Sequence, residues 1–351
     1  MPNPVRSDAV WARRALAAAV VLTVVAAGLS APSSASTSLL DPRDMARGVT
    51  ITQPQCAALG SAVWVRAMGR DFCIRYYLST AGGEGRRPVV FMQGDKGWRY
   101  DPRTRSFILP PDARPYDPAN FMRFADSFSK AARTTAIYLA RMGVDGSSGH
   151  HAQRHSVLEL AVMNAALTAI RQRHGFDGFH LVGQSGGASL VGGLLGLRRD
   201  IGCAVPGAGR LARLETRPPP ADPALQRFDP IDGIPAIVRH SQARILVVTD
   251  PQDVRVPYRH QATFVEELRR AGGQVEHYFI EATDANHHGT VAYTRPAVAA
   301  CIRGASPLEI SAELAAIVAR RLAARVRAQE RRNAPQATPR NDRPATQLQG
   351  V

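Results

Sequence analysis

The chain has 351 residues, of which 45% are hydrophobic, so it can build a sizeable core and is not a wholly disordered protein. Its formal net charge is +15, carried almost entirely by arginine, because Lys96 and Lys130 are the only lysines. The arginines are scattered and are not interleaved with aromatic residues along one face. This distribution argues against a nucleic-acid partner.

The N-terminal segment, residues 1–36, is predicted to be a signal peptide. Arg13 and Arg14 precede an uncharged run, residues 15–29, and the small residues 33–35 form a candidate cleavage site. The run is shorter than the ~20 residues of a membrane span, so no stable span is expected after cleavage. A retained anchor is the alternative, and the paired arginines leave both Sec and twin-arginine export open. We therefore expect an exported protein, periplasmic or secreted.

Beyond this segment, short apolar strands alternate with helices. The strands are predicted at residues 62–66, 72–78, 88–93, 134–140, 179–182, 201–205, 245–249 and 275–280. The helices are predicted at residues 118–133, 155–174, 188–197, 234–240 and 258–271, whereas residues 98–117 show no clear period and are expected to form a loop. This alternation predicts an α/β fold, with a mostly parallel central sheet and helices on both faces.

The domain boundaries follow from the same pattern. Residues 37–306 are expected to form one α/β domain, residues 307–332 a basic C-terminal helix, and residues 333–351 a disordered polar tail. In the helix at residues 118–133, the spacing of Phe121, Phe124 and Phe128 predicts a stripe that faces the core.

The four cysteines, Cys56, Cys73, Cys203 and Cys301, have no C-x-x-C spacing, so no metal site is expected. An even number of cysteines in an exported protein favours disulfides, for which three connectivities are possible. We favour Cys56–Cys73 and Cys203–Cys301, with four buried free thiols as the alternative.

The most informative motif is Gly183-Gln184-Ser185-Gly186-Gly187, directly after the apolar run at residues 179–182. A strand, a tight turn flanked by glycines and then a helix is the arrangement of a nucleophile elbow, in which the serine hydroxyl stands clear of the sheet. The glycines allow the backbone to bend sharply, and the helix N-terminus directs N–H groups toward developing negative charge. The motif therefore predicts Ser185 as a nucleophile.

A serine nucleophile needs a histidine base and a carboxylate that orients the histidine, and in elbow hydrolases they follow in the order serine, acid, histidine. Two carboxylates, Asp250 and Asp253, follow the strand at residues 245–249. Two histidines, His287 and His288, follow the strand that ends at residue 280. Both pairs come after strand ends, where open α/β sheets place their sites.

With these motifs the chain resembles the α/β-hydrolase superfamily over residues 89–298. The Asp253-x-x-Val256-Pro257 stretch is similar to the acid loop of its prolyl-oligopeptidase-like and esterase branches, which implies that Asp253 is the acid, with Asp250 as the alternative. The histidine that precedes a glycine in this superfamily corresponds to His288, with His287 as the alternative.

The resemblance also implies an oxyanion hole made of two N–H groups. The residue after the nucleophile, Gly186, offers one. The other is expected from the loop after the strand at residues 88–93, where relatives often carry a His-Gly pair and this chain has Gln93-Gly94-Asp95. The candidate is the Asp95 N–H group. In the loop at residues 143–151, we expect either substrate contact through Ser148 or His150 or a helix-capping turn with Ser147 or Ser148 as the cap.

Taken together, the residues predict an exported serine hydrolase that cleaves a carboxylic ester through an acyl-enzyme, with Ser185, Asp253 and His288 as its triad. A prolyl-oligopeptidase-like serine peptidase and a non-catalytic binding protein on the same fold are the alternatives. The expected partner is a small-molecule ester or peptide substrate, and no cofactor, metal or nucleic acid is expected. The pattern leaves substrate identity and oligomeric state open.

Overall fold

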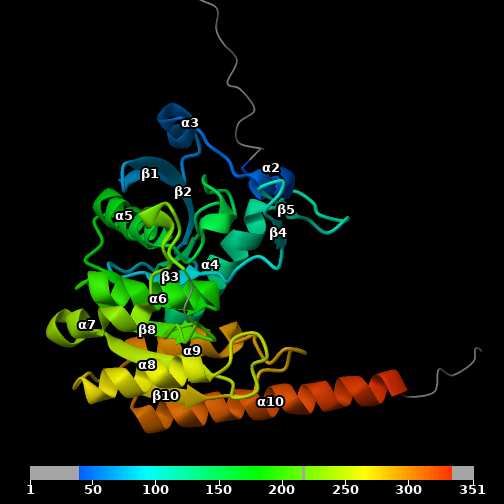
Figure 1. The fold of residues 1–351 in the computed structure, drawn as a ribbon. Helices are drawn as coiled ribbons and strands as arrows, with labels where there is room; N and C mark the ends of the chain where they lie inside the picture. Colours follow the sequence, from blue (N-terminus) through cyan, green and yellow to red (C-terminus); the bar gives the residue numbers. More distant parts are fainter. Residues whose placement is uncertain (1–38, 216–217, 334–351) are drawn as a thin grey trace, which may run out of the picture. The chain divides into compact units, whose positions relative to one another are not determined.

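The centre of the fold is an eight-stranded sheet with the strand order β1-β2-β6-β3-β7-β8-β9-β10 (Figure 1). This computed structural model describes residues 39–215 and 218–333, so the predicted signal peptide and all but the first residue of the predicted polar tail lie outside the described residues. The strands are β1 (Ala62–Ala67), β2 (Arg70–Ser79), β3 (Val89–Met92), β6 (Ala136–Leu139), β7 (Phe179–Gln184), β8 (Ile201–Gly207), β9 (Arg244–Thr249) and β10 (Glu276–Phe279).

Only β2 runs against its two neighbours in this sheet, since β1–β2 and β2–β6 pair antiparallel and the remaining pairs are parallel. Parallel pairs place the carboxyl ends of their strands at one edge. The predicted α/β-hydrolase fold class, with its mostly parallel sheet, is confirmed.

Two hydrophobic cores cover the two faces of the sheet. In β3 the side chains alternate, with Val89 and Phe91 in one core and Val90 and Met92 in the other. All four are buried, as expected for a central strand that is covered on both sides.

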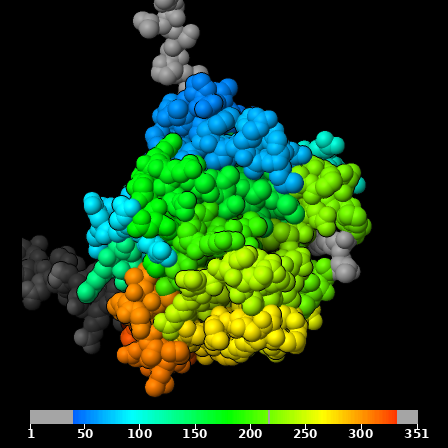
Figure 2. All heavy atoms as spheres, turned by 90° about the vertical axis from the view of Figure 1, so that its left-hand side faces the viewer, coloured from blue at the N-terminus to red at the C-terminus, as the bar shows by residue number. Residues whose placement is uncertain are grey.

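Helices from distant parts of the chain cover each face of the sheet. One core contains side chains from α5 (Val157–His174), α6 (Gly186–Leu197), α7 (Ile234–His240) and α8 (Arg259–Arg270). The other contains side chains from α4 (Pro118–Ala132), α9 (Val291–Ile302) and α10 (Pro307–Asn333). Figure 2 shows the green segment that contains α5 forming a continuous surface between the blue N-terminal residues and the yellow segment of α8.

Three features differ from the sequence-based expectation. The segment at residues 98–117 is not all loop, because β4 (Arg99–Asp101) and β5 (Ser106–Ile108) pair in it. Helix α9 was not predicted and contains Pro296 in its interior. In α4, Phe121 and Phe128 are buried as expected. Phe124 is 37% exposed, and its ring stacks on the ring of Phe91. Two short helices, α2 (Pro42–Arg47) and α3 (Gln53–Ala58), precede β1.

Both predicted disulfides are confirmed. Cys56–Cys73 joins α3 to β2, and Cys203–Cys301 joins β8 to α9. Of the helices in residues 39–215 and 218–333, none is both long enough and apolar enough to cross a membrane.

Candidate active site

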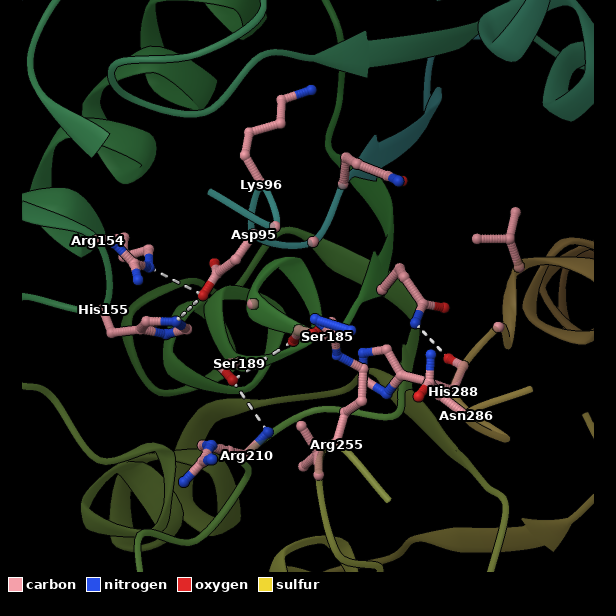
Figure 3. Close-up of a pocket in the computed structure, with 18 of the residues that line it drawn as sticks. Asp95, Lys96, Arg154, His155, Ser185, Ser189, Arg210, Arg255, Asn286 and His288 are labelled. Carbon is pink, nitrogen blue, oxygen red and sulfur yellow. Dashed lines mark hydrogen bonds and ion pairs between the residues drawn. The ribbon is translucent and has the colours of Figure 1, made fainter. Parts of the chain in front are cut away.

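The candidate active site is a cavity of about 740 Å³ at the carboxyl edge of the parallel strands. Its walls come from the segments that follow β3, β6, β7, β8, β9 and β10. Figure 3 shows Ser185 near the centre, with His288 and Asn286 on one side and Asp95 and His155 on the other. Six strand ends therefore converge on one serine, as the sheet geometry predicts.

Ser185 lies in the sharp turn between β7 and α6. Its backbone has φ 54° and ψ −117°, a conformation that costs about 1–3 kcal/mol for a residue with a side chain. The turn leaves no room beside it, because a Cβ added at Gly187 would lie 2.1 Å from the Met92 carbonyl oxygen, and one at Gly183 would lie 2.4 Å from the Gly187 backbone. Gly183 and Gly187 are therefore required by close backbone approach, whereas Ser185 itself lines the cavity.

His288 and Asp253 are hydrogen-bonded to each other. The His288 Nδ1–H group donates to Asp253 Oδ2 at 2.7 Å, and the Asp253 side chain is only 1% exposed. The other carboxylate oxygen accepts the N–H groups of Arg255 and Val256 at 2.8 and 2.9 Å. Because Nδ1 is engaged, Nε2 is the ring nitrogen left to accept a proton, and His288 lines the same cavity as Ser185.

A second histidine–aspartate pair lies beside the first. His287 Nδ1 is 3.1 Å from Asp250 Oδ2, which also accepts the Ala282 N–H group at 2.7 Å. His287 does not line the cavity, unlike its neighbour. Because this pair joins the loop that follows β9 to the loop that follows β10, it holds the two loops together.

Gln184, whose role the sequence did not reveal, ties the elbow to the histidine loop. Its Nε2 donates to the His288 carbonyl oxygen at 2.6 Å, and its Oε1 accepts the Thr290 N–H group at 3.0 Å. Both ends of one side chain therefore fix the loop that carries His288 relative to the residue before Ser185. Since this contact spans 104 residues of sequence, no local pattern signals it.

The loop after β3 brings Asp95 close to the elbow. A Cβ at Gly94 would lie 2.9 Å from the Ser185 Cβ, and one at Gly186 would lie 2.2 Å from Asp95 Oδ1. Within residues 39–215 and 218–333, neither the Asp95 N–H group nor the Gly186 N–H group donates to another protein group. Two N–H groups near the serine are thus left available.

The Asp95 carboxylate is anchored by two arginines and a histidine. Arg141 lies 2.7 Å from Oδ1, while His155 and Arg154 lie 2.8 and 3.1 Å from Oδ2. Burial alone would raise the pKa of Asp95, but His155 and Arg141 outweigh it and hold this pKa well below its usual value. The carboxylate is therefore ionised at neutral pH.

Arg141 extends this anchor into the core. Its side chain is 1% exposed and binds both oxygens of the fully buried Glu159, at 2.9 and 3.1 Å. Arg141 follows β6 at the carboxyl edge, and that position was the one available signal of its role. The next N–H group in the Asp95 loop, that of Lys96, donates to His151 Nε2 at 3.2 Å. Burial lowers the pKa of His151 well below its usual value, so its neutral ring accepts this bond.

The loop at residues 143–149 neither contacts the cavity nor caps a helix. Ser148 Oγ accepts the Cys73 N–H group at 2.8 Å, and Ser147 Oγ accepts the Arg75 N–H group at 3.0 Å. Both serines therefore join the loop to β2. Helix α5 is capped by Ser156 instead, and His150 caps a short 3₁₀ turn.

No protein-family model matches the chain, and no curated protein does so either. Among solved structures, it is similar to an acylaminoacyl peptidase from Pyrococcus horikoshii at 12% identity and a TM-score of 0.43, over 69% of this chain and 39% of that one. It is also similar to an esterase from Pyrococcus furiosus at 13% identity and a TM-score of 0.49, over 74% of this chain and 96% of that one. The chain thus spans about two fifths of the peptidase. Likeness at this level is one of fold, and the chemistry has to follow from the chain's own residues.

Proposed function

We propose that the protein is a serine hydrolase that cleaves a carboxylic ester through an acyl-enzyme. The observation that carries the proposal is the Asp253–His288 hydrogen bond, which engages Nδ1 of a histidine lining the same cavity as the strained Ser185. A serine hydroxyl becomes a useful nucleophile only when a base of this kind receives its proton.

In the first half-reaction, Ser185 Oγ attacks the ester carbonyl carbon and its proton passes to His288 Nε2. The carbonyl oxygen then carries the negative charge of a tetrahedral intermediate. When the intermediate collapses, the bond to the leaving alcohol breaks and the alcohol takes the proton from Nε2. Asp253 stabilises the imidazolium that exists between these two transfers.

In the second half-reaction, a water molecule replaces the alcohol. His288 Nε2 takes one proton from the water, the resulting oxygen nucleophile attacks the acyl carbon, and Ser185 leaves with that proton. The products are an alcohol and a carboxylic acid, and the serine is regenerated. Both half-reactions use only the ester, one water molecule and side chains of this protein.

The Gly186 and Asp95 N–H groups are the proposed donors to the tetrahedral oxygen. Neither is used by another group among the described residues, and Gly186 opens helix α6. The loss of one such donor costs ~10²–10³-fold in kcat in serine hydrolases. Anchoring of the Asp95 carboxylate by Arg141, Arg154 and His155 supports this role, because it holds the loop backbone in place.

Labelling with a fluorophosphonate probe tests the proposal. Wild type and His287→Ala are expected to be labelled, whereas Ser185→Ala and His288→Ala are expected to lose labelling and 4-nitrophenyl acetate hydrolysis together. A folded wild-type protein that stays unlabelled would contradict the proposal. A panel of esters and peptides follows, and faster turnover of peptides than of esters of matched acyl group would overturn the ester assignment.

We also propose that the protein is exported and oxidised. The two disulfides and the signal-like residues 1–36 support this, because disulfides persist outside the reducing cytosol. Mass spectrometry of the non-reduced protein from the culture medium and cell fractions tests it. Retention of the whole chain in the cytosol with four free thiols would refute it.

A further inference from the structure

The C-terminal segment of helix α10, residues 319–332, lies outside the hydrophobic core. In the first part of the helix, Ile310 and Leu314 are buried, and Ile317 and Val318 pack against the same core. None of residues 319–332 is buried. At ~1.5 Å per residue, about 20 Å of helix therefore continues without a contribution to the core.

The sequence explains why the packing stops at this point. Ile310, Leu314 and Ile317 recur at the four- and three-residue spacing of one helix face. The same spacing next reaches Arg321 and Arg325. Apolar side chains would be needed at these positions to continue the core, so the arginines end the packing while the helix goes on.

The α10 segment carries concentrated positive charge. It contains six arginines and one acidic residue, Glu330. Arg321 contacts the domain, because it donates to Thr283 Oγ1 at 3.2 Å and lies over the Tyr293 ring. Within residues 39–215 and 218–333, the other five have exposed side chains that form neither an ion pair nor a hydrogen bond: Arg320, Arg325, Arg327, Arg331 and Arg332.

The helix dipole accounts for only part of this charge. Cationic side chains in the last turn stabilise a helix, because they lie at its negative end, and this effect falls off within one turn. Arg331 and Arg332 lie in the last turn, whereas Arg320, Arg325 and Arg327 precede it. Arg327 and Arg331 are also four residues apart, so they repel each other. A negatively charged partner would relieve this repulsion.

Apolar side chains accompany the arginines. Leu322 and Val326 are four residues apart and therefore share one face of the helix, on which Leu322 is half-buried and Val326 is 56% exposed. Arg320, Arg327 and Arg331 are spaced by seven and four residues and share another face. A helix with apolar side chains on one face and arginines on another suits the boundary between the headgroups and the acyl chains of a membrane.

We propose that residues 319–332 of α10 dock the protein on an anionic lipid surface. The arginines bind the headgroups, and Leu322 and Val326 enter the boundary beneath them. The helix lies on the membrane without crossing it, in keeping with its low apolar content. A second copy is a poor partner, because two such segments carry the same charge. The site is separate from the cavity around Ser185, so this inference does not depend on the proposed hydrolase activity.

Cosedimentation with lipid vesicles tests the docking site. The full chain is mixed with vesicles of phosphatidylcholine alone and with vesicles of equal parts phosphatidylcholine and phosphatidylglycerol. Wild type is expected to bind the anionic vesicles more tightly, and to lose this excess between ~0.1 and ~1 M NaCl, because the Debye length falls from ~10 to ~3 Å. Binding to the neutral vesicles measures any contribution of residues 1–36. No excess on the anionic vesicles would overturn the proposal.

Charge removal locates the binding in α10. Arginine and glutamine have similar helix propensities, so glutamine removes charge and keeps the helix. Each arginine near an anionic surface is worth ~5-fold in affinity, so a fourfold variant is expected to bind anionic vesicles ~100-fold more weakly. This α10 variant replaces with glutamine Arg320, Arg325, Arg327 and Arg331. The matched control replaces with glutamine four exposed arginines elsewhere, Arg103, Arg114, Arg199 and Arg239. The control is expected to bind as wild type does, and equal losses in both variants would overturn the proposal.

Lysine at the same four α10 positions keeps the charge and is expected to restore binding. This variant separates loss of charge from loss of folding, which circular dichroism and the melting temperature check directly. No recovery by folded protein would count against the proposal.

A double variant separates a lipid surface from a dissolved polyanion. Leu322→Gln combined with Val326→Gln is expected to weaken binding to anionic vesicles but not to heparin. If it binds vesicles as wild type does, while the α10 variant loses vesicles and heparin alike, a dissolved polyanion is the partner and the lipid proposal is wrong. If wild type self-associates in sedimentation velocity and the double variant does not, a second copy occupies the segment and the proposal is equally wrong.

Discussion

Replacing Asp253 with asparagine is the sharpest test of the triad, because the structure dictates how the new amide is oriented. One oxygen of Asp253 accepts the N–H groups of Arg255 and Val256 at 2.8 and 2.9 Å, and the other accepts His288 Nδ1–H at 2.7 Å. In Asp253→Asn, the amide oxygen stays with the two backbone donors. The amide NH₂ group then faces His288 and donates to Nδ1.

This reversal places the imidazole proton on Nε2, the atom that receives the serine proton in the proposed mechanism. The base is blocked while the geometry of the site remains. The same substitution in a serine protease triad lowers kcat by ~10⁴-fold, which corresponds to ~5 kcal/mol of transition-state stabilisation. We expect a loss of this size for Asp253→Asn.

The neighbouring pair provides a matched control. In Asp250→Asn, the oxygen that accepts His287 and the Ala282 N–H group is expected to remain an acceptor, and the bond from the Gln252 N–H group is lost. This costs ~1–3 kcal/mol of stability, but the His288 proton does not move, so kcat is expected to stay within ~10-fold of wild type.

The assay is kcat for 4-nitrophenyl acetate at saturating substrate, with thermal unfolding of each variant as the check on folding. The reasoning is refuted if folded Asp253→Asn keeps more than about a tenth of the wild-type kcat. It is equally refuted if Asp250→Asn loses as much activity as Asp253→Asn. If Asp250→Asn loses ~10⁴-fold in kcat while Asp253→Asn does not, the two pairs have exchanged roles, with His287 as the base.

Four further predictions concern stability. Gly187→Ala is expected to destabilise the fold by ~3 kcal/mol or prevent folding, because the new Cβ would lie 2.1 Å from the Met92 carbonyl oxygen. Gly97→Ala is the control, because a Cβ there has no atom within 4 Å, and its free energy of unfolding in denaturant is expected to match wild type. Arg141→Met is expected to cost ~3–5 kcal/mol, since it leaves Glu159 buried without its partner, and Arg141→Lys is expected to recover part of this; urea midpoints that match wild type would contradict it. Burial raises the pKa of Asp95, but His155 and Arg141 outweigh burial, so this pKa is lowered. The stability that the Asp95 carboxylate contributes is therefore present above its unfolded-state pKa of ~3.9 and is lost as pH falls through its folded-state pKa. The destabilisation of Asp95→Asn should therefore be full at pH 7 and shrink only in stronger acid; a destabilisation unchanged down to pH 2 would count against it. Removing Cys203–Cys301, with a separation of 98 residues, is expected to cost ~4–5 kcal/mol, more than the ~3 kcal/mol for Cys56–Cys73 with 17, and equal falls in melting temperature would dispute the loop-length argument.

The sequence was sufficient for the features that lie in short motifs after strands. The elbow around Ser185 needs only a strand, glycines and a helix within a few residues, and the structure contains all of them. The candidates Asp253 and His288 each follow a strand end, so the topology alone brought them to one edge. The choice of His288 over its neighbour His287 depended on the resemblance, because adjacent residues have the same sequence context, and the catalytic roles stay a prediction.

What the sequence could not predict depends on contacts between distant segments. Arg141 reaches Asp95 across 46 residues, and Gln184 reaches His288 across 104. Helix α9 was missed because Pro296 removes a backbone donor from its interior, yet the helix persists since it is packed between the sheet and α10. The β4–β5 pairing was missed because it is stabilised by aromatic contacts, such as Tyr100 with Phe107, in place of a regular apolar period.

The Gln184 side chain has a consequence for protein engineering. A short peptide containing the serine turn could be grafted onto another strand–helix junction with its glycines intact, and the recipient would still lack an aligned base. The amide of Gln184 holds the backbone of His288 and Thr290, so the transplantable unit is discontinuous and includes a loop from the far end of the chain. If the proposed function holds, a graft of the pentapeptide alone is expected to leave the serine hydroxyl unreactive. A graft that also includes the His288 carbonyl and Thr290 N–H partners of Gln184 is expected to keep the histidine loop in place.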